Sequence, residues 1–150
     1  MATEIDRILF VVGDRIVTES DVAFEAFFDL RDQSPIAPFE GRAADRERFL
    51  AEIAVIRQLA SDIAVYRPTN SSVRTRADAF LGTFANPEAG LRALADWGLD
   101  ETAFLGFLYS RLVVEQYVLR DVATGDSAPR WRENYTAWVA EQVARAPIRK

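Results

Sequence analysis

The chain has 150 residues, of which 49% are hydrophobic, and its 23 acidic and 18 basic residues give a formal net charge of −5. This length is that of a single domain with a core of its own, and the acidic balance argues against nucleic acid as a partner, because phosphate binding needs clustered positive charge. The absence of cysteine and histidine excludes disulfides, the usual zinc sites, and catalysis by an imidazole or a thiolate.

The first elements that the sequence predicts form a β-hairpin over residues 5–18. The apolar run Ile8–Val12 is followed by Gly13-Asp14, which favours a turn because glycine adopts a positive φ at little cost. The residues Thr18–Asp21 have the spacing of a capping box, in which a hydroxyl and a carboxylate three positions on satisfy backbone N–H groups at a helix start. We therefore expect the first helix over residues 19–32.

A loop and a long helix are expected next. Residues 33–42 contain two prolines and a glycine, which is typical of a loop. Residues 43–67 have the pattern of one long amphipathic helix that Pro68 ends, because apolar residues recur every three or four positions. These positions are Phe49, Ile53, Ile56, Ala60 and Ile63. A shorter helix capped by Thr69 or Asn70 follows.

Three further helices complete the predicted helical part. Asn86-Pro87 has the cap and the first-turn proline of a helix start, and Gly98 is placed to end that helix with a positive φ. Asp100 caps the stretch 101–122, which is apolar nearly all round and is therefore expected to be the central, buried helix. The last helix carries an aromatic stripe formed by Trp131, Tyr135 and Trp138.

The predicted fold is a mainly helical single domain of about six helices with a small β element. We expect the hairpin 5–18 to be joined by the C-terminal segment 146–150, because a two-stranded hairpin is marginal alone. The helical core is expected to span residues 19–124, and the closing helix and tail residues 128–150. Residues 123–130 are expected to be a linker.

The order of these signals resembles the chaperone core of the SurA family, which consists of periplasmic folding factors for outer-membrane proteins. The resemblance covers nearly the whole chain and is most specific between Ile5 and Phe28 and at the WGLD junction, residues 97–100. It implies that strands from the two ends of the chain lie together. The segments that carry it are IDRILFVVGDRIVTESDV, LAEIAVIRQLASDIAVYRPTNSSV, LRALADWGLDETAF, LYSRLVVEQYVLRDV and YTAWVAEQVARAPIRK.

The chain departs from that family in one respect. SurA-type proteins usually carry one or two parvulin-type prolyl isomerase domains between the long helix and the closing helix, whereas here only residues 123–130 separate the two. No such domain fits there, so the resemblance implies a protein that is not an enzyme, uses no cofactor and acts in outer-membrane protein biogenesis as a chaperone. Its expected partners are unfolded or partly folded polypeptides that present apolar or aromatic segments.

The resemblance also implies the bacterial envelope as the compartment. Residues 1–20 lack the basic and long apolar stretches of a signal peptide. We therefore expect the periplasm if an upstream signal peptide was removed, and the cytoplasm otherwise. No apolar run approaches the roughly 20 residues of a membrane-spanning helix, so stable membrane insertion is not expected.

Five apolar residues of the first helix and the following loop are the candidate peptide-binding residues. The four phenylalanines among them are too many to point easily into one small core, which favours an apolar groove that binds client segments by burial and with little sequence selectivity. The alternative is that they pack against the long helix. The five residues are Phe24, Phe27, Phe28, Ile36 and Phe39.

Two other patterns have both a functional and a structural interpretation. Asp21, Glu25 and Asp29 recur every four positions, as in a site for a divalent cation or a basic peptide, but we interpret them as a solvated acidic face. Arginines alternate with aromatic residues in PRWRENYTAW, residues 129–138, as in some nucleic-acid-binding segments, but we interpret this stripe as core. We therefore predict no metal site, while an enzyme that uses carboxylates alone stays an alternative.

The last alternative is a structural or assembly protein that uses the same core for oligomerisation. The short linker 123–130 would allow the closing helix to be exchanged between the protomers of a homodimer. A mass that depends on protein concentration would favour this interpretation.

Overall fold

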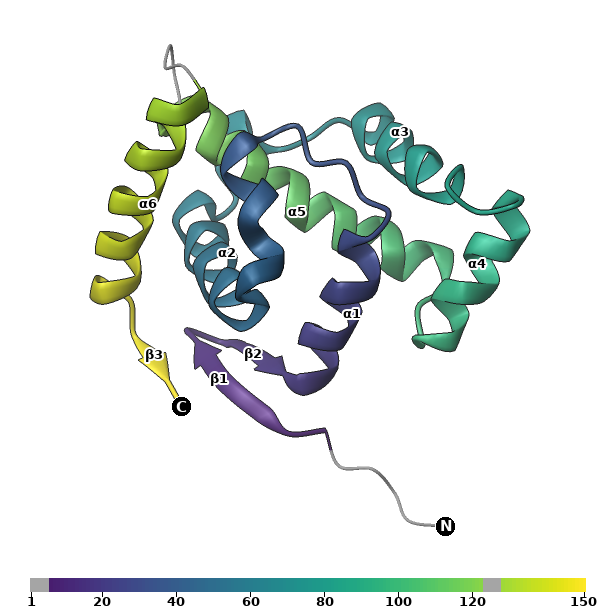
Figure 1. The fold of residues 1–150 in the computed structure, drawn as a ribbon, viewed down its shortest axis with the longest axis horizontal. Coiled ribbons are helices and arrows are strands. Elements are labelled where there is room, and N and C mark those ends of the chain that lie inside the picture. The colour runs from purple at the N-terminus through teal and green to yellow at the C-terminus, as the bar shows by residue number, and fades with distance from the viewer. Residues whose placement is uncertain (1–5, 123–127) are drawn as a thin grey trace.

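The computed structural model describes residues 6–122 and 128–150 of the chain. In these ranges the protein is mainly helical, with six α-helices, two 3₁₀ helices and one three-stranded antiparallel sheet (Figure 1). This confirms the predicted fold class, with the two 3₁₀ helices in addition to the expected helices. Residue 5 of the predicted hairpin, residues 123–124 of the predicted helical core and residues 123–127 of the predicted linker lie outside the described residues.

The elements follow one another closely along the chain. In chain order they are β1 (Ile8–Val12), β2 (Arg15–Thr18), α1 (Glu19–Asp29), η1 (Ala37–Ala44), α2 (Arg46–Ala60), η2 (Ala64–Tyr66), α3 (Asn70–Leu81), α4 (Pro87–Asp96), α5 (Glu101–Asp121), α6 (Ala128–Arg145) and β3 (Ile148–Arg149).

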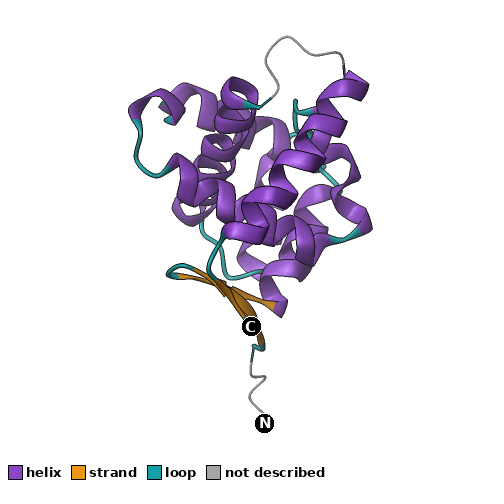
Figure 2. Cartoon of the chain, turned by 90° about the vertical axis from the view of Figure 1, so that its left-hand side faces the viewer, coloured by secondary structure: helices purple, strands orange, loops and turns teal. Residues whose placement is uncertain are grey.

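The small sheet joins the two ends of the described chain, as expected. Its strand order is β2-β1-β3, with Val12 of β1 opposite Ile148 of β3, and Figure 2 shows the strands together at one end of the molecule. Gly13 forms the hairpin turn with a φ of 60°. A Cβ at this position would lie 1.7 Å from the side-chain amide of Gln58, which itself donates to the Val12 carbonyl at 3.1 Å. The turn therefore requires glycine both for its φ and for this close approach.

Local capping starts α1, α3, α4 and α5 where the sequence predicts them. At α1 the Asp21 N–H donates to Thr18 Oγ1 at 3.3 Å, and the Thr18 N–H donates to Asp21 Oδ2 at 2.8 Å, which completes the capping box. The side chains of Thr69, Asn86 and Asp100 cap α3, α4 and α5 in the same way. These starts depend on contacts across three residues, which explains why the sequence alone identifies them.

Several predicted boundaries are wrong, among them the end of the predicted linker 123–130, since α6 begins at Ala128. The first helix ends at Asp29 rather than at residue 32, and the predicted loop 33–42 contains most of η1. The predicted helix 43–67 begins at Arg46 and stops at Ala60, where Ser61 has a φ of 46°. Serine and aspartate favour turns over helix interiors, and the break at Ser61-Asp62 lets η2 bring Tyr66 into contact with the core.

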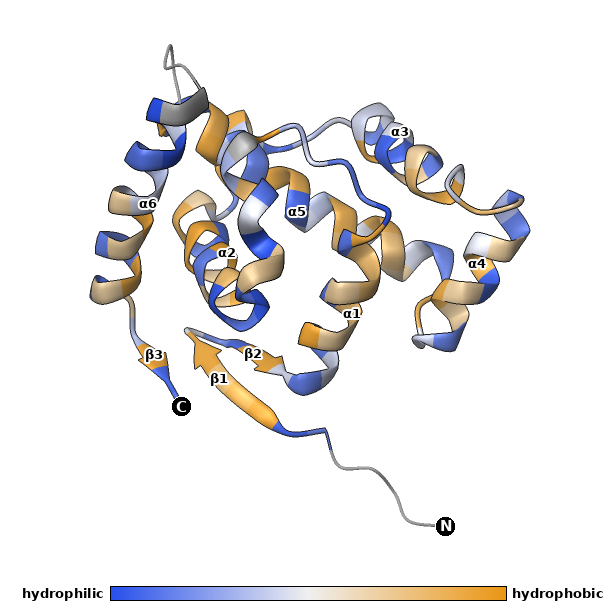
Figure 3. Cartoon of the chain, viewed as in Figure 1, coloured by the Kyte–Doolittle hydropathy of each residue, from blue (hydrophilic) through white to orange (hydrophobic). Residues whose placement is uncertain are grey.

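Helix α5 is the centre of the fold, as predicted for residues 101–122. It contacts α2, α3, α4 and η2, and Figure 3 shows hydrophobic residues along much of its length. One group of buried residues, the sheet-side cluster, joins the sheet to η1, α2, α6 and the C-terminal half of α5. A second group, the aromatic cluster, joins α1, α3 and α4 to the N-terminal half of α5. Among the described residues no helix is both long enough and apolar enough to cross a membrane.

Candidate functional site

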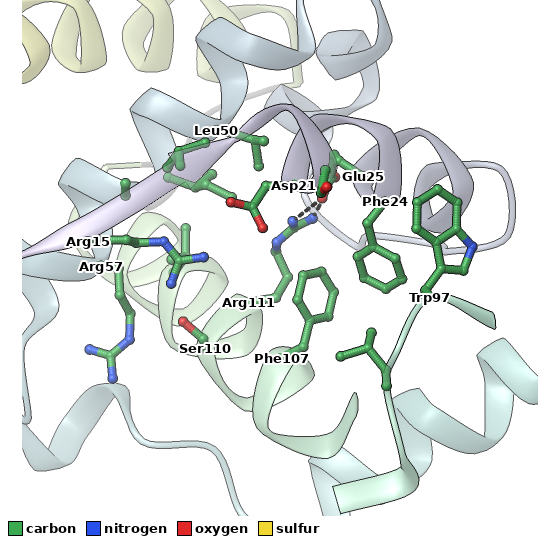
Figure 4. Close-up of a pocket in the computed structure, with 16 residues that line it drawn as sticks. Arg15, Asp21, Phe24, Glu25, Leu50, Arg57, Trp97, Phe107, Ser110 and Arg111 are labelled. Carbon is green, nitrogen blue, oxygen red and sulfur yellow. Dashed lines mark hydrogen bonds and ion pairs between the residues drawn. The ribbon is translucent and has the colours of Figure 1, made fainter. Parts of the chain in front are cut away.

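A cavity of about 210 Å³ lies where β2, α1, α2 and α5 meet (Figure 4). Its lining from β2 consists of Arg15 and Val17, and β1 contributes no lining residue. Helices α2 and α5 each contribute one face to the cavity. In both helices the lining residues follow one another at intervals of three, one and three positions, so they lie on one side of the helix over two turns. These residues are Leu50, Ile53, Ala54 and Arg57 of α2, and Phe107, Ser110, Arg111 and Val114 of α5.

One end of the cavity is aromatic. The ring of Phe24 from α1 meets Trp97 at a centroid distance of 5.7 Å and Phe107 at 5.1 Å, both edge to face. This is a preferred geometry for aromatic pairs and holds the three rings in place. The Trp97 side chain, with Leu99 beside it in the lining, is 40% exposed, so this end offers apolar surface to solvent.

The other end of the cavity carries two arginines, Arg15 and Arg57, which Figure 4 shows on the side away from Trp97. Arg57 Nη1 donates to the Ser61 carbonyl at 2.7 Å. Within the part of the chain that the structure describes, neither guanidinium forms an ion pair with a carboxylate. The cavity is therefore amphipathic, with an aromatic end and a cationic end.

A buried ion pair forms part of the wall between these ends. Arg111 donates to both carboxylate oxygens of Glu25, at 3.1 and 2.5 Å, and the two residues are 3% and 1% exposed. The guanidinium also lies 5.3 Å from the ring centroids of Phe28 and Phe107. Because the guanidinium and the carboxylate form two parallel hydrogen bonds, this ion pair holds α1 against α5 and helps to set the shape of the cavity.

The expected solvated acidic face of α1 is wrong. Asp21 serves the capping box, Glu25 is buried against Arg111, and Asp29 accepts from Arg42 Nε at 2.5 Å. The reason is that η1 and α5 bring arginines against this face, which the sequence of α1 by itself does not reveal. Nor do the described residues contain a group of three or more acidic side chains that could hold a metal ion.

Further buried charges link α1, η1, α3 and α5. Arg76 of α3 donates to Asp32 at 2.6 and 2.8 Å and to Glu115 at 2.8 and 2.9 Å. Arg42 reaches the same Asp32 at 3.2 Å, and Ser34 donates to Glu115 at 2.9 Å. Together with the Glu25–Arg111 pair, these residues form what we call the buried ion network. Sequence reasoning missed it, although two charged residues four positions apart in the apolar helix α5 were an available signal.

The structure does not bring the five candidate peptide-binding residues together. Phe24 lines the cavity, and Phe27 is half-buried beside it with its ring centroid 5.5 Å from that of Trp97. Phe28 is 0% exposed in the aromatic cluster. The remaining two candidates lie in the other cluster, so the expectation of one groove lined by all five is wrong.

Those two residues are core because of the 3₁₀ helix that replaces the expected loop. Ile36 and Phe39 are 0% and 1% exposed in the sheet-side cluster. The Phe39 ring meets Phe49 and Tyr135 at centroid distances of 5.0 and 6.0 Å. The turn of η1 thus directs them under α2 and α6, away from solvent.

The aromatic stripe of α6 is core, as interpreted. Tyr135 is buried, and Trp131 and Trp138 pack half-buried against the same sheet-side cluster. The Tyr135 hydroxyl donates to Glu52 Oε2 at 3.4 Å, and burial together with the nearby Glu52 charge raises the pKa of Tyr135. Burial likewise raises the pKa of Glu52, against the opposing effect of Arg48. The cavity residues that sequence reasoning missed include those of β2, α2, α5 and the α4–α5 junction.

A comparison with protein-family models and with curated proteins finds no match to this chain. The resemblance to the SurA family thus stays a prediction. The geometry describes a site that can bury an aromatic side chain at one end and attract a negative charge at the other.

Proposed function

We propose that this protein is a non-catalytic, chaperone-like protein that binds unfolded or extended polypeptide segments through their apolar and aromatic side chains. The observation that carries the proposal is the aromatic end of the cavity, where Phe24 and Phe107 form a wall beside the partly exposed Trp97. Burial of apolar surface contributes about 25 cal/mol per Å² and depends little on the sequence that supplies it. Such a site suits clients that vary in sequence.

The size of the cavity limits what enters it. A cavity of about 150 Å³ can hold benzene, so the volume of about 210 Å³ here accommodates one aromatic ring at a time. A client therefore inserts a single aromatic side chain. One inserted ring gives weak, reversible binding, which is what a protein that must later release its clients requires.

The test uses a fluorescently labelled, aromatic-rich peptide and an unfolded outer-membrane protein as clients. Trp97→Ala removes the exposed part of the aromatic end and is expected to weaken peptide binding about tenfold, and to lose most of the suppression of client aggregation. Fluorescence anisotropy and light scattering measure the two effects. Circular dichroism verifies that the variant is folded.

The matched control is Leu30→Ala, since Leu30 is 81% exposed and lies outside the cavity. This variant is expected to bind the peptide like the unmodified protein. Equal affinities for the Trp97→Ala and the unmodified protein would overturn the proposal.

The proposal places the protein in the bacterial envelope, and this part is supported by the resemblance to the SurA family alone. Fractionation of cells that express the full natural reading frame tests it. Recovery with periplasmic markers is expected, whereas recovery with cytoplasmic markers would contradict this location.

An assembly protein is the second candidate. Helix α6 buries Tyr135 and Val139 in the sheet-side cluster, and β3 pairs with β1. Because these contacts join the end of the chain to earlier elements, two copies that exchange α6 and β3 would make the same contacts. A mass that rises with protein concentration favours this candidate, and a constant monomer mass removes it.

A further inference from the structure

The two arginines at the cationic end of the cavity contrast with the buried arginines. Arg42 and Arg111 are each paired with a carboxylate at 2.5 Å. Arg15, by contrast, has an exposed side chain without a hydrogen bond or ion pair to any residue that the structure describes, and Arg57 donates only to a backbone carbonyl. A guanidinium without a carboxylate at the mouth of a cavity is available to an anionic ligand.

The net charge at the cationic end stays positive when the charges of the neighbouring carboxylates are counted. The lining contains three arginines and two carboxylates. Glu25 and Arg111 neutralise each other, and Asp21, which Figure 4 shows between the two ends, accepts from the Thr18 N–H at 2.8 Å. The lining therefore has an excess of one positive charge in a chain with a net charge of −5. An acidic group on the ligand fits this end, and a basic one is repelled.

The length of the cavity sets a spacing for the ligand. Its face on α5 runs from Phe107 to Val114, which at 1.5 Å per residue is about 10 Å. Side chains of an extended chain alternate between its two faces, so only residues an even number of positions apart can enter the same cavity, and two or four positions span about 7 or 13 Å. A ligand that reaches both ends therefore has its aromatic and acidic side chains two or four positions apart.

The strand beside the cavity favours an extended ligand. β2 is an edge strand of the sheet and has no second strand partner within the described ranges. It is β2, and not its neighbour β1, that lines the cavity. A strand edge of this kind accepts an extended chain through backbone hydrogen bonds.

We infer that the cavity selects extended peptide segments in which an acidic side chain lies two or four residues from an aromatic one. The aromatic ring enters the end formed by Phe24, Trp97 and Phe107, and the carboxylate pairs with Arg15 and Arg57 at the other end. The inference rests on the proposed function and adds the charge preference of the site. It makes Arg15 and Arg57 specificity-determining residues.

The experiment compares peptides whose ends are blocked by acetylation and amidation. Each peptide contains one phenylalanine and, two or four positions away, an aspartate, an asparagine or a lysine, in both orders. In low salt the aspartate peptide of one order is expected to bind at least fivefold more tightly than its asparagine counterpart, and the lysine peptide more weakly than either. Raising the salt concentration is expected to reduce this ratio, because the pairing is near the surface.

Two variants assign the preference to the arginines. R15Q/R57Q is expected to remove the preference, so that the aspartate and asparagine peptides bind with equal affinity. R15Q alone, which keeps the bond of Arg57 to Ser61, is expected to show part of the effect. Arg92→Gln, an exposed arginine outside the cavity, is the matched control and is expected to keep the full preference.

The outcomes separate this inference from the proposed function. Equal affinities for the aspartate and asparagine peptides in both orders, with Trp97→Ala weakening both, would overturn the charge preference and support the proposed function. A preference that survives in R15Q/R57Q would overturn the role of the two arginines. Failure of all peptides to bind would contradict the proposed function itself.

Discussion

The buried ion network and the cationic end of the cavity differ in how their charges are paired. In the network each guanidinium faces carboxylates at hydrogen-bond distance, as Arg76 does with Asp32 and Glu115. At the cavity, Arg15 faces no carboxylate within the described part of the chain. The first arrangement holds four elements together, and the second leaves charge available to a ligand.

The difference follows from exposure. Removing an ion from water costs several kcal/mol after relaxation, so a buried charge persists only when partners compensate for this desolvation. Arg76, Asp32 and Glu115 have side chains that are 11%, 1% and 2% exposed, and all of them are paired. An exposed guanidinium keeps its water and needs no partner, which is the state that a binding residue requires before its ligand arrives.

The largest expected effect comes from breaking the buried pair. Arg111→Met leaves the Glu25 carboxylate without its bidentate partner, with Arg42 Nε next at 3.9 Å. We expect the free energy of unfolding to fall by about 3–5 kcal/mol, the usual result when one partner of a buried pair is removed. Urea denaturation followed by circular dichroism measures this.

An exposed pair provides the control for this comparison. In the Arg74–Glu101 pair both side chains are about half exposed, so Arg74→Met is expected to change stability little. The double variant Glu25→Gln/Arg111→Met is expected to be more stable than Arg111→Met alone, because no unpaired carboxylate remains. A loss in Arg111→Met no larger than that in Arg74→Met would show that the network does not stabilise the fold.

A smaller effect is expected at the helix start that engages Asp21 beside the cavity. Thr18→Ala removes the hydroxyl that accepts from the Asp21 N–H, which typically lowers stability by about 1 kcal/mol. Peptide affinity of the folded protein is expected to stay unchanged, because Thr18 does not line the cavity. Thermal unfolding and peptide titration measure the two quantities. A loss of affinity without a loss of stability would show that the cap controls the charge balance of the site.

The smallest effect concerns Glu52, a partly buried carboxylate that belongs to neither region. Burial raises its pKa above the model-compound value of 4.5, so the folded state binds the Glu52 proton more tightly than the unfolded state does. The stability that this group contributes is present below about pH 4.5 and is lost as the pH rises through the folded-state pKa. Glu52→Gln is therefore expected to gain stability relative to the unmodified protein between pH 4 and pH 7. The urea denaturation midpoints of the variant and of the unmodified protein, measured at pH 4 and pH 7, give this gain. An equal difference between the two proteins at both pH values would refute the raised pKa of Glu52.

The candidate site could be predicted only in part from the sequence. Phe24 was identified because aromatic residues crowd the first helix, and it does line the cavity. Phe28 has the same residue type on the same helix and is completely buried. Which of the two phenylalanines reaches the cavity depends on the orientation of α1 relative to α5. That orientation is set by contacts between residues about 80 positions apart, such as Phe24 and Phe107.

By itself the sequence determined the features that depend on neighbours along the chain. The turn at Gly13 and the caps at Thr18, Asn86 and Asp100 follow from local backbone geometry and hydrogen bonds. Only the tertiary structure decided that Glu25 is buried, since its partner Arg111 lies 86 positions away. Burial and pairing arise when separate helices pack together, so the cavity and its charges were fixed by that packing.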